Sequence, residues 1–110
     1  MSTKFKAYAA TAIGGPLTPF EFDPGPLRPE QVEVKVSHCG ICHSDLHVRD
    51  GHWKRPGPIV MGHEGAGIVQ AVGPGLDPGV VGRPVALTWY APCLRCRECQ
   101  RGRQWLCSGS

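Results

Sequence analysis

QVEVKVS, residues 31–37, has the clearest periodicity in the chain. Its three valines alternate with charged or polar residues, which predicts a β-strand with the valines on one face. Short apolar or alternating runs between Gly- and Pro-rich turns predict further strands at residues 4–10, 17–22, 65–72 and 84–89. Pro19 marks the strand at 17–22 as an edge strand, because proline cannot donate to a ladder.

The composition fits short strands and turns better than long helices. Of 110 residues, 15 are Gly and 11 are Pro, and they interrupt almost every window long enough for a helix. One short helix is expected over residues 44–49, with Ser44 or Asp45 near its N-terminus. The hydrophobic share of 41% allows only a modest core. We therefore expect one small, mainly β domain, barrel-like or a sandwich, or a piece of something larger, with irregular loops carrying Cys and His.

Charge and apolar runs exclude several function classes. Twelve basic and nine acidic residues give a net charge of +3, which is too weak a balance to indicate nucleic acid as a partner. The first residues lack the apolar run of a signal peptide, and no stretch approaches the roughly 20 residues that span a bilayer. We expect a cytoplasmic protein without a membrane partner. Its six cysteines are then better explained as metal ligands than as disulfides.

Four of the cysteines, Cys93, Cys96, Cys99 and Cys107, are spaced C-x2-C-x2-C-x7-C. Four thiolates satisfy tetrahedral zinc and leave no open position, so this spacing predicts a structural zinc site. Four neighbouring arginines would offset the negative charge of such a site. An iron–sulfur site is the alternative, although ferredoxin-type runs have a shorter last gap followed by proline. A basic zinc module for nucleic acid is a third reading, but no recognition helix is predicted.

A second group of metal-type side chains lies in Cys39-Gly40-Ile41-Cys42-His43 and in Gly62-His63-Glu64-Gly65. The first motif has three readings: a thioredoxin-like redox pair, a c-type haem attachment site, or part of a metal site. The strand-rich context and the absence of an export signal disfavour the first two. A thiolate from Cys42 and an imidazole from His63 suit zinc, but two ligands do not close a site, so a third is required from elsewhere.

Three motifs together resemble the zinc-dependent medium-chain alcohol dehydrogenases. They are GICHSDLH at 40–47, GHEGAGIV at 62–69 and the four-cysteine loop, and the resemblance covers essentially the whole chain. Cys42 and His63 are 21 residues apart, and His63 and Cys93 are 30 apart, as in that family. The resemblance implies that residues 1–110 form a GroES-like catalytic domain, a partly open β-barrel, with 93–107 as its structural zinc lobe.

The resemblance also assigns a catalytic metal site. Cys42 and His63 would be ligands of the catalytic zinc, with Glu64 beside the metal as a transient ligand or a neighbour of the ligands. Asp45 would orient the imidazole of His63 through its other ring nitrogen. Cys39 would be a neighbouring thiol that does not bind the metal. Alternatively, Asp45 has no role in the metal site and only caps the short helix.

Further residues receive roles in proton transfer and cofactor binding. Ser44 would accept the alcohol proton and His47 would pass it to solvent, while His43 would face the pyrophosphate of NAD or NADP. The alternatives are a capping role for Ser44 and an ordinary surface position for His47 and for His52. Trp53 and Trp89 resemble aromatics that line small-alcohol pockets, or they pack at the barrel mouth.

The family implies more than this chain contains. Its members carry a C-terminal Rossmann domain and a third catalytic zinc ligand downstream, and no G-x-G-x-x-G occurs here between a strand and a helix. We expect the N-terminal portion of an oxidoreductase that acts on a small alcohol or aldehyde and forms a homo-oligomer at full length. The isolated chain is expected to be inactive, with its catalytic zinc site incomplete. A zinc-stabilised binding module and an iron–sulfur electron carrier remain the alternatives.

Overall fold

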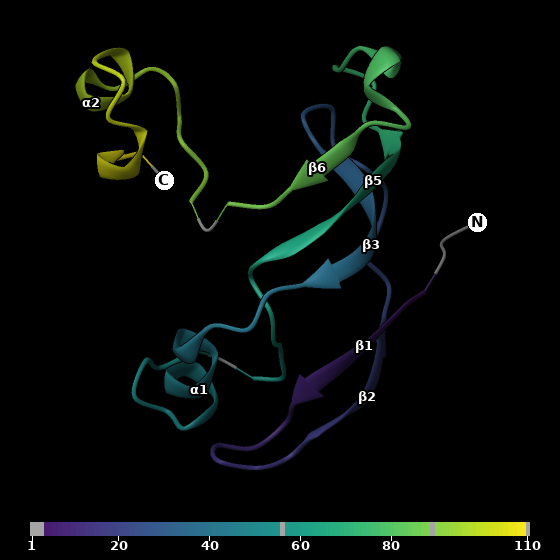
Figure 1. Ribbon diagram of the computed structural model, residues 1–110, viewed down its shortest axis with the longest axis vertical. Coiled ribbons are helices and arrows are strands. Elements are labelled where there is room, and N and C mark those ends of the chain that lie inside the picture. The colour runs from purple at the N-terminus through teal and green to yellow at the C-terminus, as the bar shows by residue number, and fades with distance from the viewer. Residues whose placement is uncertain (1–3, 56, 89, 110) are drawn as a thin grey trace.

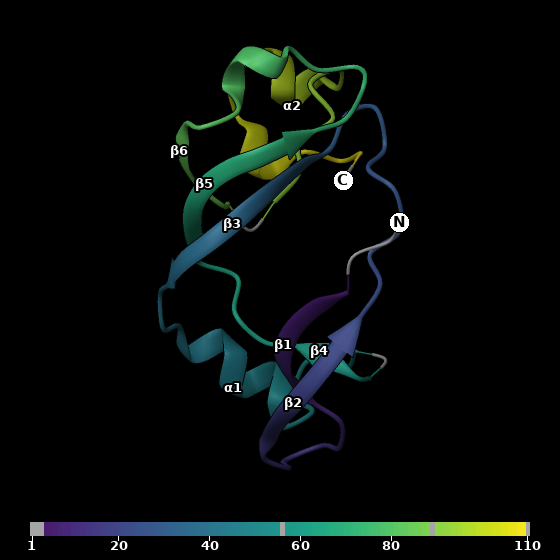
Figure 2. The same cartoon turned by 90° about the vertical axis from the view of Figure 1, so that its right-hand side faces the viewer.

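The computed structural model describes residues 4–109 except residues 56 and 89 (Figure 1). Six strands form two open three-stranded sheets, in the orders β2-β1-β4 and β3-β5-β6. The predicted mainly β fold is confirmed. Within the described residues the strands do not close into one barrel, and Figure 2 shows the two sheets apart, with β3, β5 and β6 above β1, β2 and β4. The strands are β1 (Phe5–Ala10), β2 (Leu17–Phe22), β3 (Val32–Cys39), β4 (Ile59–Val60), β5 (Gly65–Val72) and β6 (Pro84–Ala86).

The first sheet matches the sequence prediction closely. β2 has the predicted bounds and lies at the edge of the sheet, paired antiparallel with β1. Pro19 therefore costs no ladder hydrogen bond on the side that faces away from β1. β4 is only two residues long and pairs with Ala9 and Ala10. This short strand was not predicted, because two residues are too few to show a period.

The second sheet is built on the antiparallel pair β3 and β5. Small residues in β5 allow this pairing: a Cβ on Gly67 would meet the backbone carbonyl oxygen of Lys35 in β3. The register shifts between Glu33 and Val34 and again between Val36 and His38. These shifts break the strict alternation expected of β3, and Val36 stays 56% exposed.

The core is small, as the composition indicated. Among the described residues, the buried hydrophobic side chains are Ala9, Ala10, Val69 and Cys99. Many larger apolar side chains keep a substantial exposed fraction, Ile41 and Ile13 most of all. Apolar burial alone therefore contributes little stability to this chain. No helix among the described residues is long and apolar enough to cross a bilayer.

Helix α1 (His43–Arg49) lies where a helix was expected, but its cap differs from the capping alternative. Cys42 is the N-cap residue and no side chain caps the helix. Ser44 contacts the Cys42 sulfur, and Asp45 accepts from Gly62 and His63. The reading of Ser44 and Asp45 as capping residues is therefore wrong, because both side chains are engaged by the loops around the helix.

The C-terminal segment stands apart from both sheets (Figure 1). It contains the short helix α2 (Arg97–Gln100) and the 3-10 turn η2 (Gln104–Leu106). A further 3-10 turn, η1 (Pro78–Val80), lies earlier in the chain, between β5 and β6. β6 ends at Ala86, so the strand expected over 84–89 is shorter than predicted. Trp89, expected at a pocket, lies outside the described residues.

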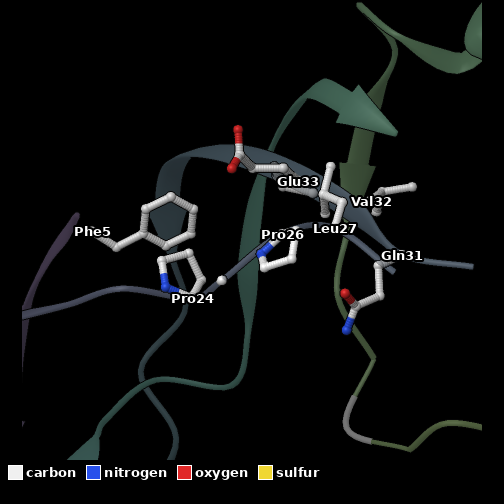
Figure 3. A pocket seen from close by; sticks show the side chains of 9 residues that line it. Phe5, Pro24, Pro26, Leu27, Gln31, Val32 and Glu33 are labelled. Atoms are coloured by element: carbon white, nitrogen blue, oxygen red, sulfur yellow. The ribbon is translucent and has the colours of Figure 1, made fainter. Parts of the chain in front are cut away.

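A hollow of about 280 Å³ between β1, β3 and the turn at residues 24–27 is shown in Figure 3. Apolar side chains such as Phe5, Pro24 and Leu27 line it, together with polar groups. Its one acidic side chain, Glu33, accepts a hydrogen bond of 2.7 Å from Gln70. No thiol, imidazole or nucleophilic group lines this hollow, so the chemistry of the chain lies elsewhere.

Candidate metal centres

Two loops far apart in the chain bring three metal-type side chains together. Cys42 immediately precedes α1, whereas His63 and Glu64 lie between β4 and β5. Their ligand atoms, one each from a thiol, an imidazole and a carboxylate, all lie within 4.8 Å of one another. A backbone hydrogen bond of 3.0 Å from Gly40 to the carbonyl of Glu64 ties the two loops together beside the cluster. We call this group the Cys42 cluster.

Asp45 fixes the orientation of His63. Its Oδ1 accepts from the ring Nδ1 of His63 at 3.1 Å and from the backbone N–H of Gly62 at 3.2 Å. Since a carboxylate only accepts, the proton of a neutral His63 ring belongs on Nδ1. The lone pair on Nε2 is then free to bind a metal.

Thiol and imidazole also favour their charged forms in this cluster. The pKa of Cys42 is lowered, first by the side-chain hydrogen bond with Ser44, whose Oγ is 2.9 Å from the sulfur, and then by the Ser44 backbone and by His63. The pKa of His63 is raised by its hydrogen bond to Cys42 and then by Asp45. Both shifts favour the charged forms relative to isolated side chains, and binding of a cation at Cys42 would favour the thiolate further.

A cavity of about 740 Å³ opens beside the Cys42 cluster. Its polar lining residues are Ser44, Asp45, Arg55 and His63, and the remainder is mostly apolar. Such a cavity suits a small organic molecule with one polar end. Trp53 does line it, together with Val48, Arg55, Ile59, Val60, Met61 and Gly62. Arg55, Ile59, Val60 and Met61 were not identified from the sequence, because the loop and the short β4 that carry them have no periodic signal.

The remaining histidines fall outside this cluster. His43 is exposed, and its ring packs edge-on against His47 at 4.9 Å between centroids. His47 also contacts the rings of His52 and Trp53. Cys39 belongs to neither group of metal-type ligands, and its sulfur is exposed.

The four C-terminal cysteines form the second group, which we call the four-cysteine lobe. The sulfurs of Cys93, Cys96, Cys99 and Cys107 lie within 4.8 Å of one another. Leu94, in the left-handed region at φ 62°, allows the tight turn after Cys93. Backbone N–H groups point at the sulfurs of Cys93, Cys96 and Cys107.

Within this lobe, the pKa values of Cys96 and Cys99 shift in opposite directions. Backbone hydrogen bonds from Cys99 and then Ser108 lower the pKa of Cys96 to about 6. Burial raises the pKa of Cys99, the one buried hydrophobic residue of the lobe, to about 12. Four thiolates cannot share this space without a cation, whereas a zinc ion would stabilise all four. All four arginines there are exposed, and Arg103 lies 3.8 Å from Glu98.

All six cysteines lie within the described residues, and all are free thiols. Five of the six belong to groups whose ligand atoms could hold a metal ion. The donor chemistry fits zinc at both groups: four thiolates at one, and thiolate with imidazole and carboxylate at the other.

Comparison with known proteins gives the family. Residues 28–110 match the family model described as the alcohol dehydrogenase GroES-like domain, so the chain belongs to that family. The aldehyde reductase AdhA of Synechocystis is 44% identical over 105 residues, which cover 94% of this chain and 31% of that protein. The chain therefore spans about a third of the length of such relatives.

Solved structures agree on the fold. The cobalt- and zinc-bound thermostable alcohol dehydrogenase of Pyrobaculum aerophilum superposes with a TM-score of 0.85 at 29% identity, over 96% of this chain and 32% of that one. The CAD protein of Helicobacter pylori, solved with NADP(H), gives 0.84 at 29% identity, over 98% and 32%. The resemblance found in the three sequence motifs is thus confirmed.

Proposed function

We propose that this chain is the catalytic-domain portion of a zinc-dependent dehydrogenase that interconverts alcohols with aldehydes or ketones, using NAD or NADP. The observation that carries the proposal is the convergence of the Cys42, His63 and Glu64 ligand atoms within 4.8 Å beside a cavity of about 740 Å³. The aldehyde reductase and alcohol dehydrogenase names of its relatives support the same reaction class.

Cys42 and His63 would hold the catalytic zinc, and Glu64 would lie beside it as a transient or neighbouring ligand. The donor set of one soft thiolate, one imidazole and one carboxylate is of the kind that leaves a position open for substrate. Zinc held there supplies a Lewis acid for the oxygen of the alcohol or carbonyl. Asp45 keeps the Nε2 of His63 available through its 3.1 Å contact with Nδ1.

Ser44 and His47 would move the proton that accompanies the reaction. Ser44 lines the cavity, and its Oγ can accept a proton from a substrate hydroxyl while donating its own. His47 follows three residues later on the same helical face, which suits it as the outlet to solvent. His43, exposed at the start of α1, would face the cofactor pyrophosphate.

We propose that Cys93, Cys96, Cys99 and Cys107 bind a structural zinc ion, so that residues 93–107 form a zinc lobe of the domain at 1–110. The lobe has a single buried hydrophobic side chain, Cys99, so apolar packing alone does not order it. A tetrahedral four-thiolate site supplies that missing stabilisation.

Cofactor binding in this proposal requires a dinucleotide-binding domain, since the 110 residues contain no G-x-G-x-x-G fingerprint after a strand. We propose a cytoplasmic protein, which the six free thiols support. A homo-oligomer at full length belongs to the same proposal.

The test is an assay of the full natural reading frame that contains this sequence. NADH or NADPH formation is followed with a panel of primary and secondary alcohols. We expect alcohol-dependent reduction that is lost in Cys42→Ser and retained in Cys39→Ser, the matched thiol outside the cluster. No reduction with any alcohol by zinc-loaded protein, or equal activity in Cys42→Ser, would contradict the proposal. The isolated 110-residue chain is expected to be inactive.

A further inference from the structure

Two histidines outside both cysteine groups form a pair with the spacing of metal ligands. The Nδ1 atoms of His47 and His52 are 3.3 Å apart. Neither residue belongs to the Cys42 cluster or to the four-cysteine lobe. In a metal-free protein, at most one proton can lie between two such nitrogens, because two N–H groups cannot point at each other.

The backbone sets this spacing. Helix α1 ends at Arg49, and Gly51 turns the chain at φ 82° while its N–H bonds the carbonyl of Val48. The N–H of Trp53 then bonds the carbonyl of His47 at 3.2 Å, which returns the loop across the last turn of the helix. His52 is thereby held over His47, with ring centroids 5.5 Å apart.

The ring of His47 is also held by its other neighbours. His43, one turn earlier on α1, packs edge-on at 4.9 Å, and the indole of Trp53 lies at 5.2 Å. Three aromatic rings around one imidazole limit its rotation, so its Nδ1 is pre-positioned. Pre-positioned ligands lose less conformational entropy when an ion binds.

The distance itself matches tetrahedral coordination. With metal–nitrogen bonds of about 2.0–2.1 Å, two ligands of one tetrahedral ion are about 3.3 Å apart. Imidazole nitrogen suits borderline divalent ions such as zinc, copper and nickel. Asp50 lies nearby, since His52 and His47 lower its pKa after the larger effect of Arg49, but its carboxylate is paired with Arg49 at 2.9 Å and the pair adds no net charge beside the imidazoles.

We propose that His47 and His52 form a further binding site for a divalent transition metal ion, with water completing the coordination. Two protein ligands make this site weaker than a four-thiolate site, and the partial exposure of the pair leaves it open to ions from solvent. The proposal does not depend on the proposed function. Only one consequence does: an ion bound to His47 would compete with proton release through that residue.

The test uses the 110-residue chain, isotope-labelled, with zinc added while the ring nitrogen resonances of all histidines are followed by NMR. We expect the Nδ1 resonances of His47 and His52 to shift with one common midpoint, at lower zinc concentration than His38. His38 serves as the reference for a single exposed imidazole, since the hydrogen-bond partner of its Nδ1 among the described residues is the adjacent Ser37.

Variants complete the test. His52→Gln is expected to raise the zinc midpoint of His47 at least tenfold, whereas His38→Gln leaves it unchanged; amide spectra verify that both variants fold. His52→Asn provides a second removal of the imidazole. Separate midpoints for His47 and His52, shifts no earlier than those of His38, or an unchanged His47 midpoint in the folded variants would overturn the site.

Discussion

Asp45 and His63 are joined by a 3.1 Å hydrogen bond between Oδ1 and Nδ1, across 18 residues of sequence. The same carboxylate oxygen accepts from the backbone N–H of Gly62. One acidic residue on α1 therefore positions both the loop that carries His63 and the ring itself. Because ligand orientation depends on such contacts, the metal affinity of the Cys42 cluster should depend on a residue that need not touch the ion.

Replacing Asp45 by Asn should weaken metal binding at the Cys42 cluster by about 10–100-fold, since the neutral amide holds the His63 ring less firmly. Competition with a chromophoric chelator measures the affinity. Asp77→Asn is the matched control, because the Asp77 carboxylate accepts from the backbone N–H of Gly79 in the η1 turn, away from the Cys42 cluster. Equal affinities for the two variants would show that Asp45 does not position the ligand.

Removing the metal should open the four-cysteine lobe while the sheets remain folded. Arg95, Arg97, Arg101 and Arg103 are exposed in this lobe, so trypsin can probe it. Without an ion, the lobe loses the bonds that order it, and cleavage after these arginines should accelerate strongly on chelation. Mass spectrometry of the fragments identifies the sites. Cleavage at the same rate with and without chelator would mean that no metal orders the lobe.

Gly67→Ala should destabilise the chain by about 1–3 kcal/mol, since the new Cβ meets the Lys35 carbonyl in the partner strand. Gly65→Ala is the control in the same strand. There the nearest atom, at 3.1 Å, belongs to the Leu87 side chain, which can move aside. Denaturant unfolding of the zinc-loaded variants measures the free energy of unfolding of each. A larger loss in Gly65→Ala than in Gly67→Ala would contradict the pairing of β3 with β5.

Arg49→Gln should raise the pKa of Asp50 toward the ordinary carboxyl value of about 3.9, because Arg49 donates the 2.9 Å hydrogen bond that lowers it. Because the pKa of Asp50 is lower in the folded chain than in the unfolded chain, the Arg49–Asp50 pair contributes to stability at pH values above the ordinary carboxyl pKa. This contribution is lost as the pH falls through the folded-state pKa of Asp50. NMR titration of the Asp50 carboxyl measures the shift, with Arg83→Gln as control. An Asp50 pKa that is unchanged in Arg49→Gln would contradict this prediction.

Local patterns predicted much of the secondary structure. The bounds of β2 and β5 match the predicted ranges 17–22 and 65–72, because alternation and flanking Gly and Pro are properties of neighbouring residues. β4 was missed and β6 was overextended, since pairing with other strands rather than local pattern sets their lengths. The register shifts in β3 likewise depend on β5.

By itself, the amino-acid sequence determined the strand content, the family motifs and the four-cysteine spacing, because each of these is encoded within a short segment of chain. The family resemblance already predicted that Cys42 meets His63 and Glu64 and that Asp45 meets His63. The tertiary structure supplied the distances in those contacts, and it alone decided that His47 meets His52 after the turn at Gly51. The physical reason is that those distances depend on hydrogen bonds between loops and on the pairing of strands, and neither leaves a periodic signal in the residues themselves.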